Sequence, residues 1–270
     1  MESVLFFFAD YPVYSYGFML GLGLLFGSLL AQREGKRKGF GSETVFRFIV
    51  WVALVFVVAG RVAFVFSIHR WHTFIYPWVL FTGVQLNEKV GCAAAVCYAM
   101  YYIIRYIPNP AGFLDVIIPS VALMQSLGHL GSNVFGRQTS QPWAVTFGQF
   151  SLHPIQLYAA ILYYLLFALL WQFRRTTRFD GQLVTGYLAL NAGIQWFLLR
   201  FREISGESPN PWLYALAALF FGGAWLYLYA SAPKNSGRRR RGAWSSIAAS
   251  IVSILGVILI MTAFFFWRYS

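Results

Sequence analysis

The stretch of residues 44–67, TVFRFIVWVALVFVVAGRVAFVFS, is long and apolar enough to cross a lipid bilayer as a single helix. Only 11% of the 270 residues are charged, whereas soluble domains carry roughly a quarter. The sequence therefore predicts an all-α fold, that of a polytopic helical membrane protein with no soluble domain. Seven more apolar stretches follow the same pattern, at residues 12–31, 90–107, 113–130, 154–173, 182–201, 211–230 and 244–267. The fourth of the eight spans, 113–130, is short and ends in Gly, His and Asn, so it is a candidate for a broken or partly spanning helix.

Positive charges set the expected orientation of these spans. The chain carries 21 Lys and Arg against 9 Asp and Glu, a net charge of +12, and its basic clusters follow the odd-numbered spans. Such clusters concentrate in the cytoplasmic loops of membrane proteins. We therefore expect a multi-pass protein of the bacterial cytoplasmic (inner) membrane with its N-terminus outside, and anionic lipid rather than nucleic acid as the partner of this charge. The clusters are Arg33, Lys36, Arg37 and Lys38, then Arg105, then Arg174, Arg175 and Arg178, and finally Lys234, Arg238, Arg239, Arg240 and Arg241.

The last basic cluster divides the chain. We expect residues 1–232 to form the membrane core, residues 233–243 a basic cytoplasmic linker, and residues 244–270 an appended transmembrane helix. A stripe of small residues, suited to close helix packing, runs along one side of this last helix. It docks either on the first seven spans or, through helix 244–267, on another membrane protein. The stripe consists of Ser246, Ala249, Ser253 and Gly256.

A polar island interrupts the apolar sequence between the fourth and fifth spans, on the side expected to face outward. It begins with GHLGSNVFGR at residues 128–137 and continues through PWAVTF at 142–147 and HPIQLY at 153–158. Polar and ionisable groups at membrane depth are costly, so they often mark functional sites. His153 and His129 are each either a proton acceptor or an interfacial side chain. Arg137 is either a bidentate phosphate ligand or an arginine on a solvated loop.

Arg61 is the strongest buried-charge signal, because it lies within the second span and needs a partner there. A lipid phosphate is one candidate partner, and Asp115 is the structural alternative. Other charges at the outer ends of spans either converge on an anionic lipid headgroup or form plain interfacial clusters. These charges are Arg200, Arg202, Glu203, Glu88 and Lys89.

The sequence predicts neither a metal site nor a cofactor. The four histidines lack a zinc-like spacing with cysteines or carboxylates. A Gly-rich phosphate loop with its lysine and a nucleophile elbow are both missing from the sequence. The histidines are His69, His72, His129 and His153.

Residues 12–205 resemble the prolipoprotein diacylglyceryl transferases. The most specific matching motif is His153-Pro154-Ile155-Gln156-Leu157-Tyr158. Other matching elements occur in the order and spacing of that family. They are Tyr16-Gly17 at the start of the first span, Gly60-Arg61 in the second, Gly136-Arg137, residues 142–147, and the penultimate span from Gly181 to Arg202.

The resemblance implies a function. Members of this family move a diacylglyceryl group from phosphatidylglycerol to the thiol of a lipobox cysteine in a preprotein, and they release glycerol phosphate. The thiol needs a base, and the leaving phosphate needs cations. By resemblance, the catalytic residues would be His153, Arg137 and His129, and the substrate-binding residues would be Tyr16, Arg61, Asn133, Gln156, Tyr158 and Arg200.

The sequence also departs from the family pattern. His129 stands where the family has an arginine, and the glutamate that follows in the family is missing. The family's histidine before the third span is replaced within residues 87–89, NEK, and its arginine in the penultimate span falls at Gln195 or Trp196. The eighth span lies outside the family's usual seven. Two hypotheses follow: an active transferase, or a catalytically inactive relative that serves as a lipid-binding assembly or structural subunit of a membrane complex.

Overall fold

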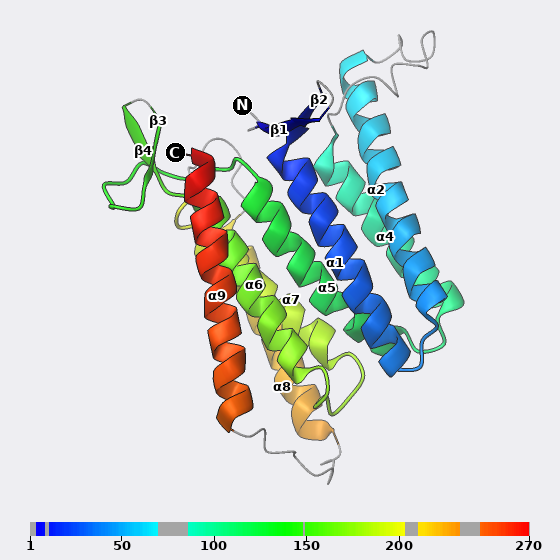
Figure 1. The fold of residues 1–270 in the computed structure, drawn as a ribbon. Helices are drawn as coiled ribbons and strands as arrows, with labels where there is room; N and C mark the ends of the chain where they lie inside the picture. The colour runs from blue at the N-terminus through cyan, green and yellow to red at the C-terminus, as the bar shows by residue number, and fades with distance from the viewer. Residues whose placement is uncertain are drawn as a thin grey trace. The chain divides into compact units, whose positions relative to one another are not determined.

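The computed structural model describes residues 4–8, 11–69, 86–147, 149–202, 210–232 and 244–269. Within these ranges it has eight α-helices and two short β-hairpins (Figure 1). The helices are α1 (Ser15–Arg37), α2 (Ser42–His69), α4 (Glu88–Tyr106), α5 (Pro110–Gly131), α6 (Ile155–Phe173), α7 (Gln182–Leu198), α8 (Pro211–Ser231) and α9 (Trp244–Tyr269). The strands are β1 (Val4–Phe8), β2 (Tyr11–Tyr14), β3 (Val145–Phe147) and β4 (Phe150–Leu152).

This architecture confirms the predicted class of polytopic helical membrane protein. In the described part of the chain, six helices are long and apolar enough to cross a membrane: α1, α2, α5, α6, α8 and α9. The two hairpins amend the all-α expectation. Because residues Tyr11–Tyr14 pair with β1, the first helix begins at Ser15 instead of residue 12. The fourth span is not broken, since α5 runs without interruption from Pro110 to Gly131 with Pro119 inside it.

Residues 31–113 form one compact unit, built on α2 and α4. Two glycines allow these helices to approach closely. A Cβ on Gly91 would lie 2.8 Å from the carbonyl oxygen of Phe56, and a Cβ on Gly60 would lie 3.2 Å from that of Asn87. The Asn87 side chain also caps α4 by accepting a hydrogen bond from the Val90 N–H at 3.2 Å. Gly60 is therefore a helix-contact residue.

Residues 1–30 and 114–270 form a second compact unit. Small residues of α1 lie against α5 here. A Cβ on Gly23 would lie 3.1 Å from the Met124 Cα, and at the end of α5 the Ser15 hydroxyl donates to the Gly131 carbonyl at 2.9 Å. In a bilayer such close backbone contacts replace the hydrophobic effect as the force that joins helices. The glycines of α1 thus fix it beside the beginning of the polar island.

Asp115 anchors α7 in this second unit. Its fully buried carboxylate accepts hydrogen bonds from the backbone N–H groups of Gly181 (2.9 Å), Leu183 (2.9 Å) and Val184 (3.1 Å). The first N–H groups of a helix lack partners within the helix, and their partial positive charge favours a carboxylate. Asp115 therefore holds the start of α7 against α5.

Helix α9 packs along α6 in the same unit (Figure 1). Met261 and Phe265 are 4% and 0% exposed and join a buried cluster with Leu157 of α6. The small-residue stripe does not dock this helix on the first seven spans where the structure describes it, because Ser253 and Gly256 are both exposed, and docking of the stripe on another membrane protein stays a prediction. The helix docks through larger side chains, which fill the space beside α6 better than small ones.

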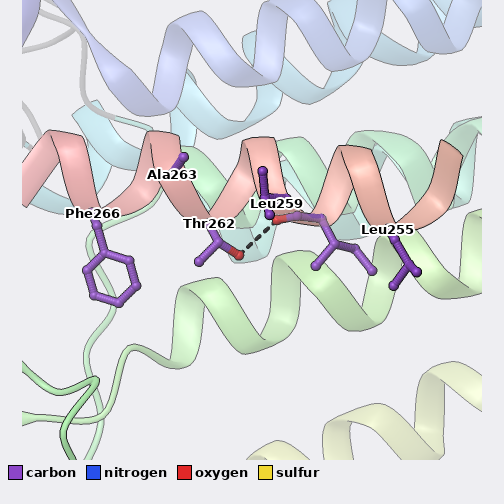
Figure 2. Close-up of a pocket in the computed structure, with 6 residues that line it drawn as sticks. Leu255, Leu259, Thr262, Ala263 and Phe266 are labelled. Atoms are coloured by element: carbon purple, nitrogen blue, oxygen red, sulfur yellow. Dashed lines mark hydrogen bonds between the residues drawn. The ribbon is translucent and has the colours of Figure 1, made fainter. Parts of the chain in front are cut away.

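A shallow apolar groove runs along another side of α9 (Figure 2). The hydroxyl of Thr262 donates back to the Ile258 carbonyl of the same helix at 2.8 Å, so its hydrogen is already bonded within α9. Exposed apolar side chains of this kind suit contact with lipid tails. The groove is lined by Leu255, Ile258, Leu259, Thr262, Ala263 and Phe266.

Candidate functional site

Backbone pairing assembles the polar island after α5. Strands β3 and β4 form a hairpin, and Gln138 pairs with Leu152 at the end of β4. Next to this bridge, the Gly136 N–H donates to the His153 carbonyl at 2.9 Å and the His153 N–H donates to the Arg137 carbonyl at 3.0 Å. Two residues that the sequence singled out separately, Arg137 and His153, are thereby held side by side.

Two aromatic residues orient the imidazole of His153. Its Nδ1 lies 3.2 Å from the hydroxyl of Tyr158, and the Trp143 indole donates to that same hydroxyl at 2.7 Å. Because an indole N–H can only donate, the tyrosine oxygen accepts from it, and the second lone pair of that oxygen can accept from an Nδ1–H, which leaves the lone pair of the imidazole on Nε2. The ring of Phe201 lies edge-on to His153, with centroids 5.2 Å apart. This arrangement leaves Nε2 as the ring nitrogen that can face a substrate.

Two arginines meet where α7 ends. The Arg137 backbone N–H donates to the Phe201 carbonyl at 2.8 Å, and its Nε donates to the Arg202 carbonyl at 2.8 Å. Arg202 lies close enough to His129 and Tyr163 to interact with them electrostatically. Its Nε is buried and has no hydrogen-bond partner among the described residues. Such a guanidinium N–H is costly unless an acceptor completes the site, and an anionic oxygen is the acceptor it binds best.

Arg200 lies apart from this pair. It is exposed, and its guanidinium stacks over the Trp196 ring at 4.4 Å from the centroid. The sequence grouped Arg200, Arg202 and Glu203 as one outer cluster and favoured Arg200 as the lipid ligand. Among the described members of that cluster, Arg202 is the one turned toward the histidine of α5. Glu203 lies outside the described residues.

His129 stacks face to face on Tyr163, with ring centroids 5.2 Å apart and planes 8° apart. The Tyr163 hydroxyl donates to Asn191 Oδ1 at 2.7 Å and accepts from Gln195 Nε2 at 2.8 Å. A polar chain thus joins α5, α6 and α7 inside the core. Sequence reasoning missed Tyr163 and Asn191, because each lies alone in an apolar span and only the fold brings them together.

The end of α9 contacts Asn133, another predicted lipid ligand. Arg268 and Tyr269 both donate to Asn133 Oδ1, the tyrosine at 2.7 Å. Gln156, also a predicted ligand, is 1% exposed and lies beside the Tyr269 hydroxyl. Its amide atoms have no hydrogen-bond partner of ordinary geometry within the described residues. No signal in the sequence placed α9 at this site.

The remaining predicted residues lie elsewhere. Tyr16, half-buried at the start of α1, lies beside Gly131. Arg61 belongs to the 31–113 unit, where its guanidinium is 5.7 Å from the Phe64 ring centroid. The Asp115 carboxylate, weighed as a counter-ion for Arg61, is engaged with the start of α7. The side chain of His69 and all of His72 lie outside the described residues, in which no group of three or more His, Cys, Asp or Glu could hold a metal ion.

The side chains of this site determine the chemistry that it can support. The histidine pair offers an oriented imidazole at His153 and a stacked one at His129. Arg137 and Arg202 offer guanidinium groups next to them, and Phe201 supplies an apolar wall. Such a site can bind an anionic oxygen and accept a proton from a group held beside it.

The fold and this site define a multi-pass helical membrane protein with a cationic, histidine-containing site where several of its helices end. The family described as prolipoprotein diacylglyceryl transferase matches residues 3–267. The chain therefore belongs to the prolipoprotein diacylglyceryl transferase family. The match extends into α9, beyond the residues 12–205 in which the resemblance was first evident.

Individual relatives carry the same name. The chain is 26% identical over 217 residues to the phosphatidylglycerol–prolipoprotein diacylglyceryl transferase of Finegoldia magna, covering 73% of this chain and 82% of that protein. It is 23% identical over 205 residues to the protein of that name from Clostridioides difficile, with the same coverage of each chain. The similarity to the Campylobacter lari protein is 26% over 210 residues, or 71% of this chain and 77% of the relative.

Proposed function

We propose that this protein transfers the diacylglyceryl group of phosphatidylglycerol to the thiol of a lipobox cysteine in a preprotein, at the outer face of the bacterial inner membrane. The cysteine sulfur forms a C–S bond to the glycerol carbon, and the C–O bond from that carbon to the phosphate breaks. The products are a thioether and glycerol phosphate. The thiol proton passes to a base and then to the released phosphate or to water. Both substrates appear in the names of the relatives.

The observation that carries this proposal is the pairing of Arg137 with Arg202 beside His153. The leaving phosphate gains negative charge as the C–O bond breaks, and preorganised guanidinium groups stabilise that charge. Arg137 is exposed, while Arg202 offers a buried N–H with no partner among the described residues. The two side chains therefore suit two oxygens of one phosphate.

His153 suits the acceptor half of the reaction. A thiol becomes a strong nucleophile only as the thiolate, so a base must lie near it. The hydroxyl of Tyr158 holds Nδ1 and leaves Nε2 for the thiol proton. Tyr16 and Arg61 remain proposed lipid ligands by resemblance to the family.

A second candidate function is lipid binding without chemistry, as an assembly or structural subunit. It is favoured by the stack of His129 on Tyr163 at a position where the family has an arginine. Gln195, one of the two positions for a further family arginine, is bonded into the same polar chain. An imidazole and an amide cannot reproduce the bidentate fork of a guanidinium.

Complementation distinguishes the two functions. The full chain is expressed in a bacterial strain depleted of its own transferase, and the mass of a reporter lipoprotein is measured. A transferase adds one diacylglyceryl group to the lipobox cysteine. An unmodified reporter, in cells where the protein is correctly inserted and copurifies with phosphatidylglycerol, would refute the transferase and support the binding subunit.

A further inference from the structure

We propose that Arg268 and Tyr269, at the end of α9, are positioning residues that orient Asn133 as a hydrogen-bond donor to a phosphate oxygen of the bound lipid. This inference rests on the proposed function, since it extends the same lipid site. It also gives the eighth span a role inside the protein instead of on a separate partner.

The end of α9 is held against the end of α5. Arg268 Nη1 donates to the Leu130 carbonyl at 2.9 Å, and Nη2 donates to the Ser132 carbonyl at 3.1 Å. The last carbonyls of a helix lack partners within the helix and carry partial negative charge, so a guanidinium stabilises them. Phe265, one turn earlier, is fully buried, which fixes the position from which Arg268 reaches across.

This geometry settles which way the Asn133 amide faces. Arg268 Nη2 and the Tyr269 hydroxyl both contact Asn133 Oδ1. A guanidinium has donors only, so the amide atom beside it must be the oxygen. The Asn133 NH₂ group is consequently directed away from Arg268, and an amide N–H in this orientation suits an anionic oxygen.

Tyr269 lies beside residues of the polar island that come before and after the β3–β4 hairpin in the sequence. Its ring lies 5.3 Å from that of Phe135, centroid to centroid, and its hydroxyl lies beside the buried amide of Gln156. Asn133 and Gln156 were both predicted lipid ligands, one before and one after the β3–β4 hairpin. Tyr269 therefore lies beside both residues and Arg268 contacts Asn133, and a positioning role follows from that placement.

The deciding variant is Asn133→Asp in the full-length protein. A carboxylate keeps, and strengthens, the bonds from Arg268 and Tyr269, so the fold should unfold at the same temperature or higher. The NH₂ donors are lost, and we expect the affinity for phosphatidylglycerol, titrated in detergent and followed by native mass spectrometry, to fall about tenfold or more. Arg268→Gln should also cause a fall of about tenfold, with partial recovery in Arg268→Lys. Arg175→Gln removes an exposed charge outside the site and should leave the affinity unchanged.

The outcomes separate this inference from the proposed function. If Asn133→Asp is stable and binds phosphatidylglycerol as tightly as the parent protein, the positioning role is refuted, whether or not the protein lipidates a reporter. If Asn133→Asp and Arg268→Gln both lose the lipid while the parent binds it, the role is supported, even where the parent proves to be a binding subunit without transferase activity. Should Arg268→Gln fail to fold, the phosphatidylglycerol affinities of Asn133→Asp and Tyr269→Phe still test the positioning role. Each of these two variants keeps the bonds from Arg268 to the Leu130 and Ser132 carbonyls at the end of α5.

Discussion

The backbone N–H of Arg137 donates to the carbonyl of Phe201 at 2.8 Å, and this bond ties the loop after α5 to the end of α7. The residue before it, Gly136, has no room for a side chain, since a Cβ would overlap the Phe201 carbonyl oxygen and the Ile155 side chain. The lipid binding proposed for Arg137 and the proton transfer proposed for His153 both depend on this close approach, because the same loop carries both residues.

Gly136→Ala should therefore separate the loop from α7. We expect a loss of about 1–3 kcal/mol in the free energy of unfolding, typical of overpacking, together with loss of lipidation. Thermal unfolding in detergent and a reporter-lipoprotein assay measure the two effects. Gly128→Ala is the matched control, because a Cβ there makes only an ordinary contact with Leu20 Cδ1 at 3.6 Å. Equal losses in the two variants would contradict the proposed role of Gly136.

Tyr158→Phe tests the orientation of His153. The change removes the hydroxyl between Trp143 and the imidazole but keeps the aromatic ring against Phe201. We expect kcat to fall about 10- to 100-fold with KM for phosphatidylglycerol little changed, because the base is misaligned while the lipid site is intact. Trp143→Phe should have the smaller effect, since the Tyr158 hydroxyl remains. A rise in KM at constant kcat would instead assign Tyr158 to lipid binding.

Substitutions of Arg202 and Arg200 test which of these two arginines binds the lipid phosphate. Arg202→Gln should raise KM for phosphatidylglycerol, or weaken its binding, about tenfold or more, because a charge-assisted hydrogen bond is lost. Arg200→Gln should have an effect of less than about twofold, since that side chain is exposed over Trp196 and surface charges contribute little. The reverse order of effects would support Arg200 as the lipid ligand, as predicted from the sequence, and contradict the role proposed for Arg202.

The apolar pattern of the sequence predicts most of the fold for a simple physical reason. A bilayer allows only structures that satisfy every backbone hydrogen bond locally, so each apolar stretch of sufficient length becomes a helix. The stretch 154–173 and helix α6 (Ile155–Phe173) differ by one residue. A helix extends beyond its apolar stretch where polar side chains form pairs along it. The predicted span ends at residue 31, but α1 continues to Arg37, which forms an ion pair with Glu34 one turn earlier.

The candidate site is only partly predictable, because its contacts join segments far apart in the chain. Motif spacing pointed to His153 and Tyr158, which are close in sequence and remain close in space. The Asp115 cap on α7 and the bond from Arg268 to Asn133 each connect residues that no local pattern relates. Side-chain direction at the end of α7, which separates Arg202 from Arg200, also depends on the fold.

Asp115→Ala tests the cap on α7. Three backbone N–H groups would lose their acceptor in a buried setting, so we expect a loss of about 3 kcal/mol in the free energy of unfolding. Asp115→Asn keeps one acceptor oxygen and should lose roughly half as much. Both are measured by thermal unfolding of the purified protein in detergent. A variant Asp115→Ala as stable as the parent protein would show that the cap contributes little.

Substitutions on two different sides of α9 test which side docks on the rest of the protein. Phe265→Ala would leave a void of about 100 Å³ against α6, and at about 24 cal/mol per Å³ the cavity costs about 2 kcal/mol of unfolding free energy. Leu259→Ala lies in the apolar groove (Figure 2), where the side chain is 71% exposed and lipid can fill the space it leaves, so its cost should be close to zero. Because Phe265 also fixes the position of Arg268, its loss should weaken phosphatidylglycerol binding as well, whereas Leu259→Ala should not. If Leu259→Ala proves the more damaging of the two, α9 docks through its other side, and the membrane-protein partner predicted from the sequence becomes the better account of the eighth span.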